Sequence, residues 1–435
     1  MKKKVIVGAG IAGIIAAYFE RKKGNQVFLV DSDKRAGGLL KSDFFGGHYF
    51  DYGTHILPET GVIEIDEFLF SGLNNGNCII GKRIKAGNYF RGQMNDKSCY
   101  VDASTLLIGQ YNQGCMELLL TEENDSALNL ENHMKNKYGE TFYTSIFLSV
   151  IKKYMGTEPS ELSSKVDNFF DMSMLLAFNN SVTKRLGNIA LYNGKLGHHI
   201  REDGVTKYYP KEGGVGGIIE NLLTKLRESG VTVLLGEKIK SINHENGVVK
   251  SLEIEDQVLE VDSLLWTLPN SFLLKLCDIN RHTEPPEFRK TGLFDFVFDK
   301  PLKSESTFIN VYDTTLFSGR ITLYQNLTQE PNFSCTVEVL TDQSIEHADL
   351  LEIIKNELRL MGLTSDNTKC LFSQFRAVGN GFPILSTTFM NEQDELNTYC
   401  SEHFSNISFI GRASSKTFFM PEVLVEVYQE SLLVD

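Results

Sequence analysis

A glycine triplet near the N-terminus constrains the fold of this 435-residue chain more than any other feature: Gly8, Gly10 and Gly13. An apolar run at residues 3–7 precedes the triplet and is typical of a buried strand. The stretch 11–23 has the pattern of a helix, and the run QVFLVD that follows is typical of a second strand ending at Asp31. Together these segments predict a β-α-β unit.

The triplet has the spacing G-x-G-x-x-G, and each glycine has its own physical reason. Gly8 permits a tight turn, Gly10 lets the backbone approach a pyrophosphate, and Gly13 lets the helix pack closely on the strand. The helix N-terminus offers free N–H groups and a positive dipole end to a phosphate. Asp31 lies 23 positions after Gly8, where a carboxylate accepts hydrogen bonds from a ribose diol. The unit predicts a dinucleotide site, which a nicotinamide cofactor or a flavin would both fit.

The segment DSDKRAGG, which overlaps the end of the second strand, favours a flavin. It places Arg35, Gly37 and Gly38 shortly after Asp31. An arginine suits a diphosphate, and glycines let the chain pass close to a cofactor. With this segment the sequence resembles the flavoprotein clan that includes amine oxidases, protoporphyrinogen oxidase, phytoene desaturases and UDP-galactopyranose mutase, in which an Arg-x-Gly-Gly segment touches FAD. The alternative is that Arg35 is a solvated turn residue.

The stretch GGHYFDYGTHILPET alternates like a hairpin and then breaks at Gly53. It resembles the clan's segment that carries the chain under the isoalloxazine ring, and its Tyr-Gly-x-His pattern resembles the mutases in particular. The resemblance implies that Gly53 and Thr54 contact the cofactor, and it makes His55 the candidate catalytic residue, with a structural core histidine as the alternative. Where the mutases have a second histidine, this chain has Leu57 and Pro58, which weakens the mutase interpretation.

A later segment resembles the second part of the cofactor domain. Four glycines within residues 213–217 precede an amphipathic pattern at 218–229 and the strand-like VTVLLG. In the clan, a backbone segment after such a strand pairs with the adenine, which here implies Lys238 and Ile239. A second dinucleotide site is the alternative, but these glycines do not follow a strand.

The C-terminal segment predicts a strand at 407–410 and a final helix that begins around Pro421. The resemblance places Gly411, Arg412 and Met420 beside the flavin. The positive end of the helix dipole would stabilise the negative charge that collects there when flavin is reduced. The mutases have an aspartate where Pro421 stands.

The expected fold class is α/β, with a Rossmann-like FAD-binding domain of the three-layer, glutathione-reductase type and an interleaved α+β substrate domain. The pattern is mostly helical at 116–176 and alternates like a β-sheet at 294–340, where the aromatic residues are more typical of sheet core than of a substrate cage. The expected FAD-binding domain comprises residues 1–75, 205–270 and 405–435. The expected substrate domain comprises residues 76–204 and 271–404.

Bulk composition argues against several classes of protein. The chain has 43 basic and 56 acidic residues, and the formal charge of −13 argues against a nucleic-acid partner. The seven cysteines are scattered without a Cys-x-x-Cys pair, so we expect neither a disulfide framework nor a metal site. The start of the chain resembles a secretory signal, but the glycine triplet argues against one. We expect a cytoplasmic protein without an integral membrane span.

The resemblance implies a non-covalently bound FAD, a small-molecule substrate and three candidate functions. The first is an FAD-dependent oxidoreductase, in which hydride passes from the substrate to flavin N5. The alternative is a UDP-galactopyranose mutase-like enzyme that acts on a nucleotide sugar in polysaccharide biosynthesis, for which Arg185, Arg201 and Arg320 lie in the right broad region. The third is a non-catalytic protein of the Rab GDP-dissociation inhibitor type. Substrate, electron acceptor and oligomeric state stay open.

Overall fold

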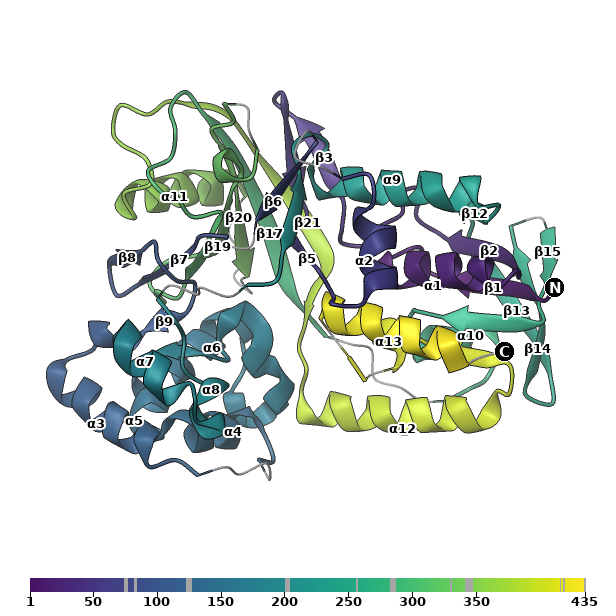
Figure 1. The fold of residues 1–435 in the computed structure, drawn as a ribbon, viewed down its shortest axis with the longest axis horizontal. Coiled ribbons are helices and arrows are strands. Elements are labelled where there is room, and N and C mark those ends of the chain that lie inside the picture. The colour runs from purple at the N-terminus through teal and green to yellow at the C-terminus, as the bar shows by residue number, and fades with distance from the viewer. Residues whose placement is uncertain are drawn as a thin grey trace.

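A computed structural model gives the fold of the chain (Figure 1). The residues it describes are 1–73, 77–81, 84–122, 127–199, 204–255, 257–281, 287–328, 331–340, 347–414, 416–417 and 419–433.

A five-stranded parallel sheet forms the centre of the first domain. In spatial order its strands are β12 (Thr232–Leu235), β2 (Gln26–Asp31), β1 (Lys3–Val7), β16 (Ser263–Trp266) and β22 (Ile407–Phe409). Every neighbouring pair in this sheet is parallel. The predicted β-α-β unit is confirmed, because α1 (Ile11–Lys22) connects β1 to β2.

Residues of β1 alternate between the two faces of this sheet. Ile6 packs in a core with helices on one face, whereas Val5 and Val7 pack against an antiparallel meander on the other. The helices are α1, α9 (Gly214–Glu228) and α13 (Met420–Leu433), and the meander consists of β13 (Ile239–Glu245), β14 (Val248–Ile254) and β15 (Gln257–Glu260). Helices, parallel sheet and meander make the three layers of the predicted Rossmann-like fold, which is confirmed. Helix α9 begins at Gly214, not at the predicted Ile218.

Two further helices share the core on the meander side. They are α10 (Asn270–Leu276) and α12 (Thr387–His403), which pack on each other and contribute Leu273 and Leu396 to the core around Trp266. The expected domain boundaries at 270/271 and 404/405 therefore lie next to helices that pack on the first domain.

A seven-stranded sheet dominates the second part of the molecule, at the upper left of Figure 1. One face, which includes Phe294 and Phe296, is packed under α11 (His347–Leu360), so these aromatic side chains form sheet core as predicted. The other face carries buried polar side chains. In spatial order the strands are β21 (Cys370–Pro383), β17 (Phe288–Phe298), β20 (Ser334–Leu340), β19 (Ser318–Leu323), β18 (Phe308–Val311), β7 (Ala86–Phe90) and β8 (Gln93–Asn95).

A helical insertion lies below this sheet in Figure 1 and has its own hydrophobic core. Its helices are α3 (Ile108–Leu119), α4 (Leu130–Tyr138), α5 (Glu140–Phe142), α6 (Leu148–Met155), α7 (Asn180–Leu186) and α8 (Ala190–Asn193), with a 3₁₀ segment, η4, at Ser164–Asp171. Lys153 at the end of α6 connects the insertion to the sheet, because its Nζ lies 2.7 Å from the carbonyl oxygens of Val311, Asp313 and Ser318.

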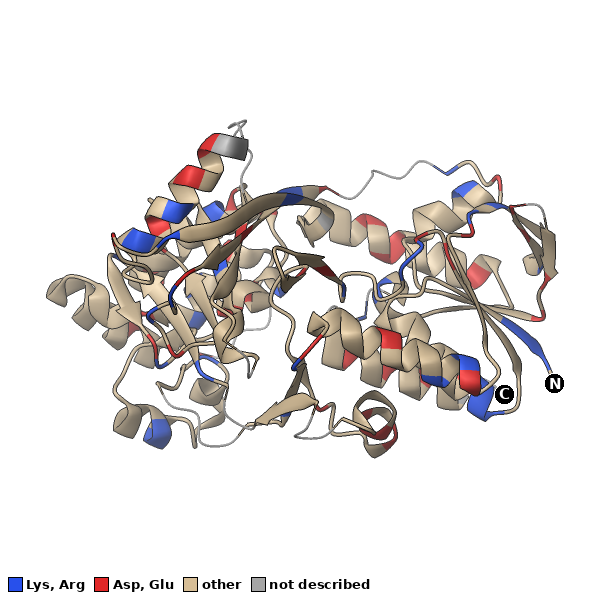
Figure 2. Cartoon of the chain, turned by 90° about the horizontal axis from the view of Figure 1, so that it is seen from above, with Lys and Arg blue, Asp and Glu red and all other residues tan. Residues whose placement is uncertain are grey.

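Short elements join these parts. They are the hairpin β3 (Ser42–Phe45) and β4 (His48–Asp51), the small sheet of β5 (Leu57–Pro58), β11 (Lys207–Pro210) and β6 (Cys78–Gly81), the pair β9 (Val101–Asp102) and β10 (Leu175–Leu176), and α2 (Ile63–Phe70). Both termini lie at the same end of the molecule, and acidic and basic residues are interspersed over its parts (Figure 2). Among the described helices, none combines the length and the apolar character needed to cross a bilayer.

Candidate functional site

The glycine triplet lies at the carboxyl edge of the parallel sheet. Gly8 follows β1 with a φ of +102°, and a Cβ there would lie 2.0 Å from Thr267 Oγ1. A Cβ on Gly13 would lie 1.9 Å from the carbonyl oxygen of Gly8. Within the described residues no side chain caps the N-terminus of α1, whose N-cap is Gly10. The triplet is thus a backbone cradle in the crevice outside the strand ends, where open α/β sheets bind nucleotides.

Glycines from two other segments close around this cradle. Gly37 forms an isolated β-bridge with Gly10, and a Cβ on Gly38 would lie 3.6 Å from the Gly10 Cα. Gly411 follows β22 with a φ of +63°, and a Cβ there would lie 3.0 Å from the Ala12 Cβ. The fold therefore brings together four of the predicted glycine positions that are far apart in the sequence.

Asp31 lies at the end of β2 as predicted, with its carboxylate turned to backbone N–H groups. Oδ2 accepts from Ala9 N–H at 2.7 Å, and Oδ1 accepts from Asp33 N–H at 2.8 Å. Each oxygen keeps a lone pair that a ribose hydroxyl can use. Gly236 donates its N–H to the Asp33 carbonyl at 2.9 Å, and Glu237 donates to the Asp31 carbonyl at 3.0 Å, which brings the segment leading to Ile239 beside Asp31.

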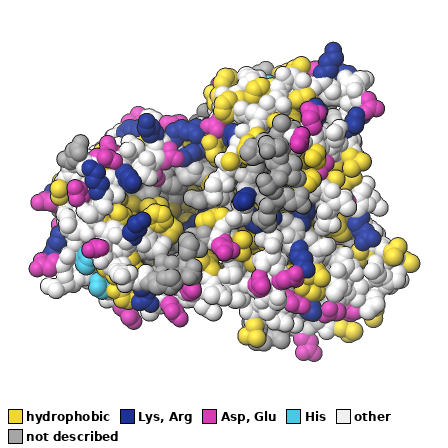
Figure 3. Space-filling model, turned by 180° about the vertical axis from the view of Figure 1, so that it is seen from behind, with side chains coloured by type: hydrophobic (Ala, Val, Ile, Leu, Met, Phe, Trp, Pro, Cys, Tyr) yellow, Lys and Arg dark blue, Asp and Glu magenta, His cyan; other side chains and the backbone are white. Residues whose placement is uncertain are grey.

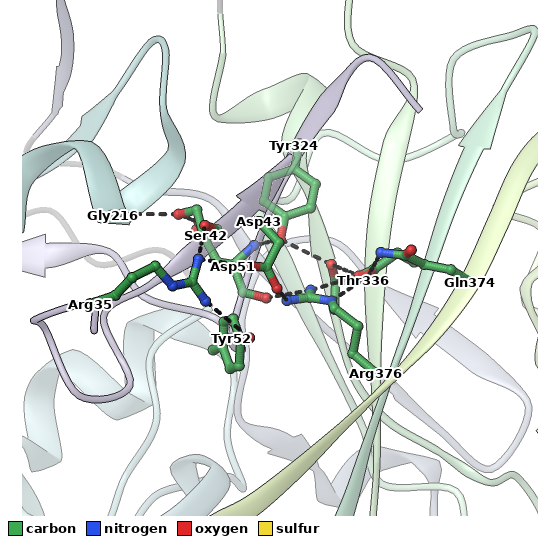
Figure 4. A network of polar contacts seen from close by, with 11 residues as sticks. Arg35, Ser42, Asp43, Asp51, Tyr52, Gly216, Tyr324, Thr336, Gln374 and Arg376 are labelled. Carbon is green, nitrogen blue, oxygen red and sulfur yellow. Dashed lines mark hydrogen bonds and ion pairs between the residues drawn. The ribbon is translucent and has the colours of Figure 1, made fainter. Parts of the chain in front are cut away.

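Arg35 turns to the hairpin β3–β4 rather than to the cradle (Figure 4). Its Nη1 lies 2.7 Å from Asp43 Oδ1, and its Nη2 lies 3.4 Å from Tyr52 Oη. The side chain is 48% exposed. The guanidinium is therefore held by an ion pair with the hairpin while nearly half of the side chain stays exposed.

Asp51 is a completely buried carboxylate at the N-terminus of α9. Oδ1 accepts from Ser42 Oγ at 2.6 Å (Figure 4). Oδ1 also accepts from Val215 N–H at 3.1 Å, and Oδ2 accepts from Tyr209 Oη at 2.8 Å. Burial raises the pKa of Asp51 to about 6, although these hydrogen bonds oppose the rise. An acidic group at a helix N-terminus is stabilised by the helix dipole, so Asp51 connects the hairpin to α9.

Arg376 connects the same hairpin to the seven-stranded sheet (Figure 4). Its Nε lies 2.6 Å and its Nη2 3.0 Å from the two carboxylate oxygens of buried Asp295, and Nη2 also donates to the carbonyl oxygen of Asp51 at 2.8 Å. Asp51 N–H in turn donates to Tyr324 Oη at 2.8 Å. The strands of the second part thus hold the segment that enters the loop Gly53–His55.

That loop lies on the polar face of the seven-stranded sheet. Glu338 Oε1 accepts from Thr54 N–H at 3.0 Å and from Arg320 Nε at 2.8 Å, while Oε2 lies 3.0 Å from Arg320 Nη2. Gly53 has a φ of +112°, and a Cβ there would lie 3.4 Å from the Glu338 carboxylate carbon. Burial opposes ionisation of Glu338, but the Arg320 charge and the hydrogen bonds outweigh it and lower the pKa of this carboxyl.

His55, the candidate catalytic residue, is held neutral beside this ion pair. Burial lowers its pKa to about 4; the Glu338 charge opposes the shift, and the charges of Arg320 and Arg412 add to it. Its Nε2 is buried and has no hydrogen-bond partner among the described residues. A buried unsatisfied polar atom is costly, so His55 has one hydrogen-bonding position that a ligand can satisfy.

Arg412 acts on the pKa of His55, and Met420 packs against the core shared by α1, α9 and α13. Arg412 is exposed in the 3₁₀ turn η6 (Gly411–Ser414), and Met420 is the first residue of α13. Helix α13 packs along α1, so both predicted residues belong to the segment that runs from the glycine cradle towards the start of α13.

An aromatic cluster lies at the junction of the helical insertion, β21 and the segment before α13. Phe169 meets Phe382 and Phe419 edge-on at centroid distances of 6.2 and 5.8 Å, and Phe170 lies 4.7 Å from Phe382. From behind, the molecule shows a hollow near its middle in which hydrophobic side chains gather (Figure 3). The ring contacts themselves join apolar side chains from three distant segments.

Sequence reasoning missed three residues of this arrangement: Asp51, Glu338 and Arg376. Asp51 carries a usable signal, because an acid two residues before Gly53 follows an apolar strand. Glu338 and Arg376 carry none, because a polar residue in an alternating strand is typical of a solvent-facing position.

The residues present fit an FAD molecule. A Cβ on Gly10 would meet no atom within 4 Å, so this glycine faces open space, whereas a Cβ on Gly13 would collide with the Gly8 carbonyl oxygen. The carboxylate of Asp31 lies at the end of β2, where it can accept hydrogen bonds from a ribose. His55 Nε2 supplies an unsatisfied buried polar atom at the other end of the site. The site therefore has a phosphate cradle, a ribose acceptor and a polar position for a ring system.

The comparisons with known proteins agree with this geometry. A model of the NAD(P)-binding Rossmann-like domain matches residues 6–65. The 1-hydroxycarotenoid 3,4-desaturase of Flavobacterium sp. (strain P99-3) is 26% identical over 286 residues, or 62% of this chain. The match spans 57% of that relative's own length.

Two solved structures share the whole fold. Reduced UDP-galactopyranose mutase aligns with a TM-score of 0.74 over 100% of this chain and 93% of the other, at 17% identity. A triple mutant of putrescine oxidase aligns with a TM-score of 0.67 over 99% and 98%, at 12% identity. All three of these similar proteins are named as enzymes, and this chain was likewise predicted to be an enzyme. In its sequence motifs and throughout its fold, the chain is similar to the FAD-dependent amine oxidase-like flavoprotein clan.

Proposed function

We propose that the protein is an FAD-dependent oxidoreductase that binds FAD non-covalently and oxidises a small molecule. The cradle of Gly8, Gly10 and Gly13 would hold the pyrophosphate, Asp31 the ribose and the backbone near Ile239 the adenine. Gly37, Gly38 and Gly411 would let the chain pass close to the cofactor, and Arg35 would contact the diphosphate only by exchanging its ion pair with Asp43.

At the reacting end, Gly53, Thr54, His55, Arg412 and Met420 would surround the flavin ring. FAD, when bound, supplies the hydride acceptor at flavin N5. The chain supplies orientation: Thr54 is fixed to the sheet through Glu338, and His55 offers a neutral Nε2 to one hydrogen bond. The N-terminus of α13 adds a positive dipole end, which favours the negative charge of a reduced ring.

The ion pair of Arg320 with Glu338 is the observation that favours an oxidation over an isomerisation. A nucleotide sugar needs free guanidinium groups for its diphosphate, but Arg320 is paired with Glu338 through Nε and Nη2. Arg185 is exposed on α7, and Arg201 lies outside the described residues. Phe382 and Phe419, which are partly buried against the core residues Phe169 and Phe170, instead suit an apolar substrate.

A mutase-like enzyme acting on a nucleotide sugar is the second candidate. The Tyr-Gly-x-His pattern at 52–55 and the fold likeness to UDP-galactopyranose mutase favour it. It differs from the first in the use of electrons, because an isomerisation needs reduced flavin but consumes no acceptor.

Purified protein tests the proposal directly. We expect a yellow protein whose flavin is released by denaturation, which shows non-covalent FAD. With apolar candidate substrates and no acceptor, we expect anaerobic bleaching of the flavin. With oxygen or a dye as acceptor, we expect acceptor consumption equal to product. A colourless protein that takes up no FAD contradicts both candidates. Turnover of a nucleotide sugar only under reducing conditions, without acceptor consumption, would favour the mutase instead.

A further inference from the structure

Glu338 joins two segments that lie 284 residues apart in the sequence. It stands on β20 with 1% of its surface exposed, and its Oε1 accepts from both the N–H and the hydroxyl of Thr54, at 3.0 and 3.2 Å. The Thr54 hydroxyl also lies 2.6 Å from Thr322 Oγ1 on β19. Because a buried carboxylate is costly unless it is paired, these contacts fix the backbone of Thr54 against the sheet.

Phe170, an aromatic residue with a strained backbone, packs against the guanidinium of Arg320. The guanidinium lies 5.2 Å from the ring centroid of Phe170, and that ring stacks on Tyr154 at 4.0 Å. Phe170 has a φ of 52° and a ψ of 35°, which is rare for a bulky residue and is typical of constrained functional regions. The Tyr312 hydroxyl donates a hydrogen bond of 2.7 Å to the carbonyl oxygen of Phe170.

The contacts form one continuous path from the helical insertion to the cofactor domain. Phe170 covers Arg320, Arg320 pairs with Glu338, and Glu338 holds Thr54 next to His55. The carboxylate and the guanidinium are both largely shielded from water, with 2% and 17% of their side chains exposed. Charges in such a place act on a neighbouring ring more strongly than surface charges do.

We propose that Glu338 is a positioning residue for the loop Gly53–His55, and that its charge, balanced by Arg320, sets the reduction potential of the bound flavin. The inference rests on the proposed function, because it requires FAD beside this loop. A fixed negative charge disfavours the negative charge that a flavin gains on reduction, and a fixed positive charge favours it. Glu338 and Arg320 should therefore act in opposite directions.

Two substitutions separate charge from shape. Glu338→Gln keeps an Oε1 acceptor for Thr54 but removes the negative charge. At a fixed potential, we expect the ratio of reduced to oxidised flavin to rise about tenfold, which equals about 30 mV for a two-electron couple. Arg320→Met leaves the carboxylate unbalanced, and we expect a shift of similar size in the opposite direction. General damage to the fold would not produce two shifts of opposite sign.

The matched control is Glu357→Gln. Glu357 is also a buried carboxylate, 6% exposed, but it stands on α11 on the other face of the sheet and accepts from the N–H groups of Phe317 and Ser318. We expect no shift of the flavin potential in this variant. Equal potentials in FAD-loaded wild-type and Glu338→Gln protein overturn the inference while the proposed function stands.

Two further outcomes complete the test. If Glu338→Gln does not fold, Arg320→Met decides: an unchanged or raised potential overturns the inference. If the wild-type protein binds no FAD, the proposed function itself fails.

As a positional readout we expect Glu338→Ala, which also removes the Thr54 contact, to weaken FAD binding at least tenfold, and Glu338→Gln to restore most of that affinity. Equal FAD affinity in all three proteins excludes the positioning role.

Discussion

Asp51 and Tyr209 share a hydrogen bond of 2.8 Å although their positions differ by 158 residues and both side chains are almost entirely buried. The bond places an ionisable carboxyl where water does not reach it. Ser42 and the N-terminus of α9 supply the remaining partners of Asp51. His55 is partly buried with its Nε2 shielded from water, and its neutral form is favoured. The two groups therefore give the fold two opposite responses to pH.

Replacing Asp51 by Asn should increase the loss of stability in acid. The carboxyl has a pKa of about 6 in the folded protein and an ordinary value of 3.8. Between these values the folded state binds the extra proton, so in the wild type this group alone raises the free energy of unfolding as pH falls. The shift corresponds to about 3 kcal/mol. Urea unfolding at pH 7 and pH 4 should show about that much additional acid loss in Asp51→Asn; parallel changes in the two proteins would contradict the assignment.

The substitution His55→Gln should decrease the loss of stability in acid. The imidazole has a pKa of about 4 in the folded protein and an ordinary value of 6.5. The unfolded state therefore binds the extra proton between these values, and stability is lost as pH falls through this window. Replacing His55 should therefore reduce the acid-induced loss in the free energy of unfolding by about 3 kcal/mol. The same urea measurements check this, and titration of the wild-type imidazole by NMR near pH 6.5 would contradict it.

Much of the first domain could be predicted because its signals are local. A strand, a glycine triplet, a helix and a terminal acid follow one another between Lys3 and Asp31, so chain order alone determines their neighbours. The aromatic strands around Phe294 were likewise predicted as sheet core from their alternation. The start of α9 at Gly214 was not predicted, because Gly214 and Gly216 are poor helix formers. Glycine is needed at 214 because the close approach of Ser42 and Asp51 leaves no room for a side chain there.

The sequence motifs indicate the residues proposed to line the cofactor, but not the side chains that hold these residues in place. These motifs need particular backbone shapes, and glycine marks those shapes directly. The residues that hold the reacting end depend on pairing between distant strands. Glu338 meets Arg320 because β20 pairs with β19 in the folded sheet, and no short-range spacing encodes its contact with Thr54, 284 residues away. The partner of Arg35, Asp43, likewise depends on the turn of the hairpin β3–β4.

Gly13→Ala should damage the phosphate cradle without any change of charge. A Cβ there would lie 1.9 Å from the Gly8 carbonyl oxygen, so α1 would have to move away from β1. We expect a loss of about 1–3 kcal/mol in stability and at least a hundredfold weaker FAD binding, measured by flavin fluorescence. The matched control is Gly109→Ala in α3, where a Cβ meets nothing within 4 Å and the better helix propensity should add about 0.5–1 kcal/mol. Equal FAD affinity in both variants would argue against the cradle.

Lys153→Met should loosen the helical insertion from the seven-stranded sheet. Lys153 Nζ donates to three carbonyl oxygens, those of Val311, Asp313 and Ser318, each at 2.7 Å. A methionine fills a similar volume but removes these three hydrogen bonds, and we expect a loss of about 3 kcal/mol. Its neighbour Lys152 forms an exposed ion pair with Glu158, so Lys152→Met should change stability by less than about 1 kcal/mol. Urea unfolding followed by hydrogen exchange in α6 checks both values, and equal losses in the two variants would contradict a specific role for Lys153.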